Sequence, residues 1–571
     1  MKTNLLKHLV LFLVLIGLNS NAQQIRYIDD IFDSVTVTPD VIYGQNITVL
    51  PTLAGAAQGA FGVPPVMQPL ACDVYEPKND TLAERPVIIV IHTGSFLPPV
   101  VNGQATGSKT DSSVVENCTR WAKKGYVAIA MTYRQGWAPT STSQAVRTST
   151  ILQAAYRGIQ DAKAMVRFLR KSADVDGNPY GVDESKIVVG GQGTGGYLSM
   201  GYATLDTVSE LYVYPKFWDT SDSLPQNHRP LIAPDLGIPG PVTFGFGNLD
   251  GSDNTYWPDS LAPFFFDTIT QLNFANNPSY SNDINMVFNL GGTLADLSWL
   301  DGYQVPHVSF HCENDPFASI DEGVIIVPTT GDIVIPDVVG SRVANHYNTK
   351  WGNNDGFNQA GLSDTLTQMA NTYNSNWNNS LNDGSLVYDG LYVFNTPAPD
   401  SAISPILGKA GEHESAPWDW WDNTLYGIQA EALYGVPGVT SPAYFEADAI
   451  NDAPNMSASY ARLHIDTIHK YLNPRMYEVL NLGASTGVDM NEIIEKTTQV
   501  YPNPAKDNLN IISYAKLINS VDLYNLSGQK VLSKKVNATT TRLKTNSLSK
   551  GVYIVDVKTN VSSVKKKIII E

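Results

Sequence analysis

One apolar run that breaks into glycines decides the fold of this chain: Ile187-Val188-Val189-Gly190-Gly191-Gln192-Gly193-Thr194-Gly195-Gly196-Tyr197. The β-branched residues at its start favour a buried strand. The glycines favour a sharp turn, because glycine tolerates a positive φ and lets backbone approach backbone. Apolar residues resume directly after Tyr197. The stretch therefore predicts a strand, a sharp turn and a helix.

The segments before this stretch predict more of the same sheet. Residues 85–92 contain a continuous apolar run, which is typical of a strand buried on both faces. Within residues 159–169 the apolar side chains follow helical spacing and predict an amphipathic helix. Strands that alternate with helices predict an α/β fold with a doubly wound, mostly parallel sheet and right-handed crossovers.

Four sequence blocks in this region keep a characteristic order and spacing. They are DVYEP (residues 73–77), RPVIIVIHTGSF (85–96), GYVAIAMTYR (125–134) and the block at 158–197 that ends in the glycine-rich turn. Together they resemble the carboxylesterase/lipase branch of the α/β-hydrolase fold, closely over residues 40–200 and more loosely over 200–480. The resemblance implies hydrolysis of a small-molecule or polymer ester of plant, algal or lipid-like origin.

The resemblance also implies a nucleophile elbow of the form G-x-S-x-G, whose turn lifts a serine above the sheet. Aligned on its glycines, the turn reads Gly191-Gln192-Gly193-Thr194-Gly195, so Gly193 stands where the serine is expected. Glycine has no side chain and cannot form an acyl intermediate. Three alternatives stay open: a nucleophile displaced to Thr194, a water activated above Gly193, or an inactive pseudo-esterase that only binds. A Thr194 nucleophile at positive φ would cost roughly 1–3 kcal/mol.

The catalytic acid and base are expected further along the chain, in the order that this family follows. Asp315, at the end of the strand-like residues 304–316, is the expected acid. His413 is the expected base that takes the proton of the nucleophile. Asp321 is the alternative acid. The alternative bases are His307, His311 and His346.

Backbone N–H groups are expected to stabilise the oxyanion of the transition state. The resemblance places these groups at Gly94 and Ser95, which follow the strand at 85–92, and at Thr194, which follows the elbow position. Thr93 departs from the family, which has glycine at this position. The sequence therefore does not determine the shape of the oxyanion hole.

Two long excursions, residues 201–303 and 317–408, interrupt the sheet pattern. Loops of this length without structure are unusual, so we expect cap, lid or edge elements in them, with short strands at 324–327 and 333–335. We expect the sheet to resume at residues 304–316 and to include residues 391–394. Residues 461–480 predict the closing helix of the domain.

The tail contains VYPNPAKDNLNI, VDLYNLSGQKVLSKKV and LSKGVYIVDVKTN, which are alternating short strands separated by turn residues. It predicts a small all-β sandwich. The tail closely resembles the type A C-terminal sorting domain of proteins that Bacteroidetes export through the type IX secretion system. This resemblance implies the secretion machinery as a partner and a secreted or cell-surface location.

The N-terminus begins with Lys2 and Lys7, continues as an apolar run at 9–16 and ends with Ser20-Asn21-Ala22. This pattern predicts a secretory signal peptide at residues 1–22. We therefore expect a hydrolase-like domain at 23–482, a linker at 483–497 and a sorting domain at 498–571. No later apolar run reaches the length of about 18 residues that a membrane span needs.

Charge is distributed unevenly along the chain. Residues 23–494 carry 23 Lys and Arg against 50 Asp and Glu, whereas residues 495–571 carry 13 against 5. An acidic main region argues against nucleic acid and anionic membranes as partners. Cys72, Cys118 and Cys312 allow either three free thiols or one disulfide, and they show no metal-ligand spacing. The sequence requires no cofactor.

Overall fold

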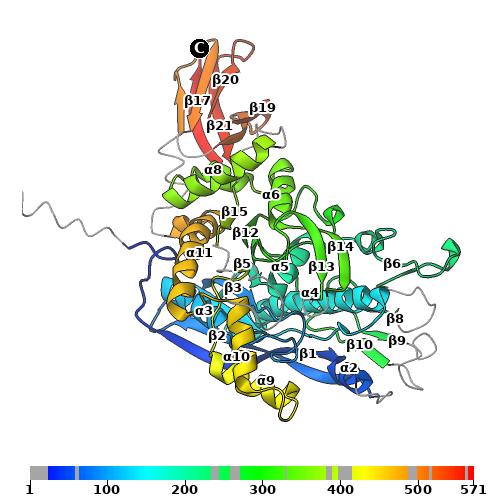
Figure 1. Ribbon diagram of the computed structural model, residues 1–571. Coiled ribbons are helices and arrows are strands. Elements are labelled where there is room, and N and C mark those ends of the chain that lie inside the picture. The colour runs from blue at the N-terminus through cyan, green and yellow to red at the C-terminus, as the bar shows by residue number, and fades with distance from the viewer. Residues whose placement is uncertain are drawn as a thin grey trace, which may run out of the picture. The chain divides into compact units, whose positions relative to one another are not determined.

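The computed structural model describes residues 24–57, 63–232, 243–257, 270–327, 331–380, 389–396, 414–485, 498–513, 517–559 and 563–571 (Figure 1). The predicted signal peptide, His413 and most of the predicted linker lie outside these ranges. The chain divides into two compact units, Met1–Leu480 and Asn481–Glu571, which are described separately below.

An eight-stranded sheet organises the first unit. Its strands, in spatial order, are β1 (Val35–Thr48), β2 (Val66–Pro77), β4 (Val127–Met131), β3 (Arg85–Ile91), β5 (Val182–Gln192), β11 (Met286–Leu290), β12 (His307–Cys312) and β15 (Leu391–Phe394). The pairs β1–β2 and β2–β4 are antiparallel, and the five pairs from β4 to β15 are parallel. The predicted mostly parallel sheet is confirmed.

Helices cover both faces of this sheet. The four helices that matter most for the site are α3 (Ser112–Lys124), α4 (Gln144–Val175), α5 (Thr194–Thr204) and α11 (Ala458–Val479) (Figure 1). Side chains alternate along a strand, and β11 shows the result: Val287 joins the core with α4 and α5, whereas Phe288 contacts Trp121 of α3. Trp121 in turn donates a hydrogen bond to Asn473 of α11. The sheet is therefore doubly wound, as predicted.

The carboxyl ends of β3 and β5 meet at the point where the strand order changes direction. From β3 the chain crosses to β4 on one side and later to β5 on the other. Ligands of open α/β sheets bind at such a switch point. The segment after β3 contains Gly94 and Ser95, and the turn after β5 contains Gly193.

The predicted helix at 159–169 is the middle of the much longer α4. A buried ion pair fixes this helix to the sheet, since Arg134, just after β4, donates to Asp161 of α4 at 2.9 Å. Neither side chain is exposed to solvent. The position of α4 against β4 is therefore set by charge as well as by apolar packing.

The expectation that the sheet resumes at residue 304 was wrong, because β11 already pairs with β5 and β12. Asn289 interrupts the apolar pattern of β11. Its side chain is buried, accepts from the N–H of Gly292 at 2.7 Å and donates to Ser341 Oγ at 2.9 Å. Ser341 is remote in sequence, so the apolar pattern alone could not show that this polar residue sits in a strand.

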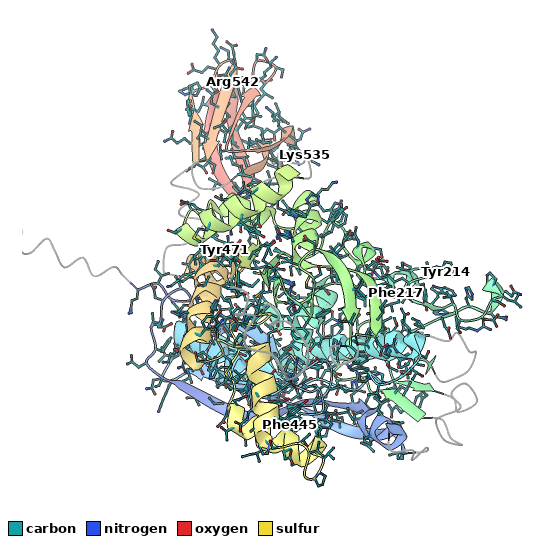
Figure 2. All side chains as sticks on the ribbon, in the orientation of Figure 1. Tyr214, Phe217, Phe445, Tyr471, Lys535 and Arg542 are labelled. Atoms are coloured by element: carbon teal, nitrogen blue, oxygen red, sulfur yellow. The ribbon has the colours of Figure 1, made fainter. Side chains whose placement is uncertain are left out.

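The excursions supply the remaining elements of the first unit. These are α2 (Leu50–Ala57), β6 (Trp218–Asp219), β7 (Arg229–Pro230), β8 (Thr243–Phe244), β9 (Thr255–Trp257), β10 (Thr270–Asn273), β13 (Glu322–Ile326), β14 (Ile333–Val339), α6 (Ser341–Lys350), α7 (Asp355–Ala360), α8 (Thr365–Ser380), α9 (Asn423–Tyr434) and α10 (Pro442–Asp452). The strands expected at 324–327 and 333–335 are confirmed as the antiparallel pair β13–β14. The predicted closing helix is confirmed as α11, whose buried Tyr471 is labelled in Figure 2.

The second unit is an all-β sandwich with its own core, as predicted. One sheet holds β16 (Thr498–Tyr501), β17 (Asn508–Ser513) and β20 (Thr540–Lys544), and the other holds β19 (Lys530–Ala538), β18 (Ile518–Asn525), β21 (Gly551–Thr559) and β22 (Ser563–Ile570). Leu509 and Ile511 of the first sheet share a buried cluster with Val521 and Val555 of the second.

Two further expectations concern the cysteines and membrane spans. Cys72, Cys118 and Cys312 are buried free thiols, and burial raises the pKa of each. Of the two alternatives, the structure shows free thiols. Within the described ranges, no helix is both long and apolar enough to cross a bilayer.

Candidate active site

The glycine-rich turn joins β5 to α5 through a single residue with positive φ. Gly193 has φ 52° and ψ −119°, and its N–H donates to the carbonyl of Leu290 in β11 at 2.8 Å. Thr194 is the first residue of α5 and has no positive φ. The backbone strain expected for a Thr194 nucleophile therefore does not arise, because Gly193 takes the strained conformation.

Two other glycines let the strand and the helix approach closely. A Cβ atom on Gly191 would lie 2.4 Å from the carbonyl carbon of Gly195, which is closer than side-chain atoms approach backbone. This contact explains the spacing of glycines in the turn. It positions the start of α5 directly over the end of β5.

The space that a side chain at position 193 would enter is already filled. A Cβ atom on Gly193 would lie 2.1 Å from Oγ1 and 2.9 Å from Cβ of Thr93. Thr93 comes directly after His92 at the end of β3, where the family has glycine. The glycine at 193 and the threonine at 93 are therefore sterically complementary.

The hydroxyl of Thr194 has a partner of its own. Its Oγ1 atom lies 3.1 Å from the hydroxyl of Tyr133, just after β4. Burial raises the pKa of Tyr133, so its phenol keeps its proton. The Tyr133 ring stacks on His92 with 4.6 Å between centroids, and burial lowers the pKa of His92 to about 4. Both rings are thus neutral near pH 7.

In the loop after β3, the carbonyl groups of Gly94 and Ser95 accept hydrogen bonds, whereas the N–H groups of the same two residues have no acceptor among the described residues. The carbonyl of Gly94 accepts from the N–H of Leu97 at 2.8 Å and from Asn102 at 3.1 Å, and that of Ser95 accepts from the Trp137 indole at 2.7 Å. In a trans peptide the C=O of one residue and the N–H of the next residue point in opposite directions. The N–H of Ser95 therefore points away from the groups that bind the carbonyl of Gly94. The N–H groups of Gly94, Ser95 and Thr194 donate to no acceptor in the described part of the chain. Unoccupied N–H groups are the kind of donor that can stabilise an oxyanion.

Asp315 lies just beyond the end of β12, in a buried position. Its Oδ1 atom accepts from the N–H groups of Phe317 at 2.8 Å and Ala318 at 3.0 Å. Its Oδ2 atom lies 3.7 Å from Nε2 of His311. Burial raises the pKa of this carboxyl to about 7, and the two backbone hydrogen bonds offset part of that rise.

The alternative bases and the alternative acid lie elsewhere. His311 is buried, with Nε2 donating to the carbonyl of Ala318 at 2.8 Å and Nδ1 facing Ser341 Oγ at 2.8 Å. His307 is buried at the start of β12, and His346 packs against Trp377. Asp321 pairs with Arg342. None of these four side chains lines the cavity described next.

One cavity of about 250 Å³ brings the described candidates together. Its wall includes Thr93, Ser95, Gly193, Thr194 and Asp315. The rest of the wall is largely apolar, with contributions from α4, α5 and the β13–β14 hairpin. Its apolar residues include Ile151, Leu152, Ile159, Leu205, Trp299 and Ile335. Trp299 packs against Phe217, which is labelled in Figure 2.

Two buried carboxylates near the turn were missed by the sequence analysis. Ser113 of α3 donates to Asp419 Oδ1 at 2.8 Å, and Gln192 Nε2 donates to Ser113 Oγ at 2.8 Å. Burial raises the pKa of Asp419 to about 6, and burial together with the charge of Asp419 raises that of Asp111 to about 7. Nothing in the local sequence around Asp419 signals this network, because its partners come from α3 and β5.

Two family models match this chain. The model described as BD-FAE matches residues 72–224, and the secretion system C-terminal sorting domain matches residues 499–571. No curated protein matches. The chain thus carries an esterase-like α/β-hydrolase domain. The residues 499–571 form a type IX sorting domain, which directs export to the cell surface or the extracellular space.

Solved structures with some similarity include esterase 2 of Thermogutta terrifontis phosphorylated by paraoxon. It is 16% identical, with a TM-score of 0.28, and the match covers 58% of this chain and 83% of that chain. The butyrate-bound form of the same esterase is 16% identical, with a TM-score of 0.27, and the match covers 50% and 76%. The fold assignment itself depends on the strand order of the sheet and on the matching family model.

Proposed function

We propose that this protein is an exported carboxylic ester hydrolase. One observation carries the proposal: a largely apolar cavity is lined by Ser95 of the loop after β3, by the turn at Gly193 and by Asp315. A cavity with convergent donors and a perturbed carboxyl is the usual form of an active site. The proposal places Gly193 at the position that the nucleophile serine holds in the family.

The N–H groups of Gly94, Ser95 and Thr194 would bind the oxyanion of the tetrahedral intermediate. Asp315 would orient the base. We propose His413 as that base; it lies outside the described residues, and the next residue, Glu414, lines the cavity. Burial raises the pKa of Asp315 to about 7, so about half of this carboxyl is protonated at pH 7, and an imidazolium beside it would favour the charged form. Such an imidazolium forms when a histidine base takes a proton.

The cavity favours an apolar acyl or aromatic acyl group. Its wall includes aliphatic and aromatic side chains of α4, of α5 and of the β13–β14 hairpin. Burial of such a group gains roughly 25 cal/mol per Å² of apolar surface. The alcohol part of the ester would extend toward the mouth of the cavity.

A second candidate function is ligand binding without catalysis. One observation favours it: Gly193 offers no hydroxyl at the elbow, and Thr194 is hydrogen-bonded to Tyr133. A water activated above Gly193, the third alternative, has less support, because Thr93 fills the space beside Gly193. The two functions differ in whether a bound ester is turned over.

The test is hydrolysis of p-nitrophenyl acetate, butyrate and octanoate by the full-length protein, with Asp315→Asn and Asp321→Asn assayed beside it. The proposal predicts turnover by the wild type and a fall in kcat of about 10²-fold or more in Asp315→Asn. Asp321→Asn should retain activity, because Asp321 pairs with Arg342 and does not line the cavity. Binding of the esters by calorimetry without any turnover would favour the ligand-binding function instead.

A further inference from the structure

We propose that the hydroxyl of Thr93 is the nucleophile of this site. The inference rests on the proposed ester hydrolase function and assigns the one catalytic group that the elbow lacks. Thr93 follows strand β3, whereas the family's nucleophile follows β5. The nucleophile would thus have moved between neighbouring strands of the sheet while staying at the same end of the cavity.

The position of Thr93 relative to Gly193 is the first observation. Thr93 Oγ1 lies 2.1 Å from the point that a Cβ atom of residue 193 would occupy. A serine at 193 and the threonine at 93 would therefore compete for the same space. The glycine at 193 leaves space for the Thr93 side chain. The Thr93 hydroxyl therefore lies close to the position at which the family has the serine side chain.

The freedom of the Thr93 hydroxyl is the second observation. Its Oγ1 atom makes no hydrogen bond in the part of the chain that the structure describes, and Thr93 lines the cavity. Thr194, the other hydroxyl at the turn, is hydrogen-bonded to Tyr133. A nucleophile must be free to give its proton to a base and its lone pair to a carbonyl carbon. Thr93 meets this requirement better than Thr194.

The backbone of Thr93 is held while its side chain stays free. Its carbonyl accepts from Nδ1 of His92 at 2.6 Å and from the Tyr133 hydroxyl at 3.4 Å. The next two N–H groups, those of Gly94 and Ser95, are unoccupied. An oxyanion that forms when Thr93 attacks would thus find donors in the same loop.

The reaction would proceed by two balanced steps. Thr93 Oγ1 forms a bond to the ester carbonyl carbon, the hydroxyl proton ends on the leaving alcohol, and the bond between the carbonyl carbon and the alcohol oxygen breaks. Water then attacks the acyl-threonine, gives one proton back to Thr93 Oγ1 and releases the carboxylic acid. No oxidant, reductant or metal enters either step.

The test is covalent labelling of the full-length protein with an alkyl fluorophosphonate, followed by intact mass and peptide mapping. The variants are Thr93→Val, which keeps the shape and removes the hydroxyl, and Thr93→Ser, which keeps the hydroxyl. Thr255→Val is the matched control, because Thr255 is buried, its hydroxyl has no hydrogen-bond partner within the described residues, and it does not line the cavity. Hydrolysis of p-nitrophenyl butyrate and the melting temperature are measured for each protein.

A single adduct on the peptide that contains residue 93, retained in Thr93→Ser and absent in Thr93→Val, would support the proposal. Hydrolysis should fall by at least about 10³-fold in Thr93→Val, be restored in Thr93→Ser and be unchanged in Thr255→Val. An adduct on Thr194 or Ser95, or a folded Thr93→Val protein that is fully active, would overturn the inference and leave the hydrolase function standing. A wild type that neither hydrolyses esters nor takes a label would overturn both.

Discussion

Two residues depart from the family pattern at neighbouring positions in space: Gly193 replaces the expected serine, and Thr93 replaces the expected glycine. Each substitution alone would harm an elbow of the usual form: glycine removes the nucleophile, and threonine blocks the space beside it. Together they are sterically compatible, since Thr93 Oγ1 takes space that a Cβ atom at residue 193 would need. This compatibility agrees with the proposed role of the Thr93 hydroxyl.

This pair predicts that Gly193→Ser alone will not create an active esterase. The new Cβ atom would lie 2.1 Å from Thr93 Oγ1, and overpacking of this kind costs roughly 1–3 kcal/mol. The double variant Thr93→Ala with Gly193→Ser should relieve the clash, regain most of the stability and hydrolyse p-nitrophenyl butyrate. Chemical denaturation and the ester assay check both parts. A single variant as stable as the wild type would contradict the steric account.

Asp315 predicts a specific dependence of stability on pH. Its pKa is about 7 in the folded protein and near 3.8 in the unfolded chain. Between these values the unfolded chain has lost the proton and the folded protein keeps it, so the free energy of unfolding falls as pH rises, by up to about 4 kcal/mol. Asp315→Asn should remove this part of the fall. Urea denaturation between pH 4 and 8 measures it, and an identical pH profile for the variant would count against the burial of this carboxyl.

Several residues of the candidate site could be nominated from the sequence because they follow a local motif. Gly193 and Thr194 were recognisable from the glycine spacing, and Gly94 and Ser95 from the end of an apolar strand. The sequence also marked Thr93 as unusual. Its contact with Gly193 could not be foreseen, because it depends on how two strands far apart in the chain lie in the sheet.

At the scale of elements, the loop after β3 is held by hydrogen bonds to its carbonyl groups. The Trp137 indole donates to the carbonyl of Ser95 at 2.7 Å, and the N–H of Gly136 donates to that of Phe96 at 2.7 Å. Ser95 and Phe96 both have positive φ, a conformation that costs free energy in residues other than glycine. These hydrogen bonds therefore maintain a strained loop with its N–H groups available.

Trp137→Phe should loosen this loop without removing an aromatic ring. One lost hydrogen bond is worth about 0.5–1.5 kcal/mol, so kcat should fall roughly three- to tenfold. Trp299→Phe is the matched control: its indole donates to Glu210 at 2.9 Å and it lines the same cavity, but it does not touch the loop. Steady-state kinetics compare the two. Equal effects from both variants would mean that the loop hydrogen bond has no special role.

Helices and strands whose apolar residues recur at regular spacing were predictable from the sequence. Elements that depend on hydrogen bonds to residues remote in sequence were not. The runs that became β3 and β5 were evident in the sequence, and so was the core of α4. β11 was not, because Asn289 in the middle of the strand is satisfied only by Gly292 and Ser341. The ends of α4 also extend beyond its regular apolar period, and near its start Arg147 donates to the carbonyl of Ile333 at 3.2 Å, a partner that is remote in sequence.

At the scale of the whole molecule, an acidic catalytic-size unit is followed by a basic sorting domain. Residues 23–494 carry an excess of acidic residues, and residues 495–571 carry an excess of basic ones. Each unit has its own buried core. This separation was predictable from the change in composition and from the turn pattern of the tail. The sequence could not show how the two long excursions would contribute to the cavity.

Deletion of residues 499–571 should block export and leave the hydrolase-like unit folded. The sorting domain matches these residues, and its core is separate from that of the first unit. In a host with a type IX secretion system, the full chain should reach the medium or the cell surface, and the truncated chain should stay inside the cell envelope. Immunoblots of the fractions, with the melting temperature of the purified truncated protein, measure both. Export of the truncated chain would contradict the prediction.

The most direct measurement is the rate of p-nitrophenol release from p-nitrophenyl butyrate by the purified full-length protein and by Thr93→Val at equal concentration. The account predicts clear turnover by the wild type and almost none by the variant, with equal melting temperatures. Equal rates would show that the hydroxyl of Thr93 is not the nucleophile. No release by the wild type would contradict the ester hydrolase itself.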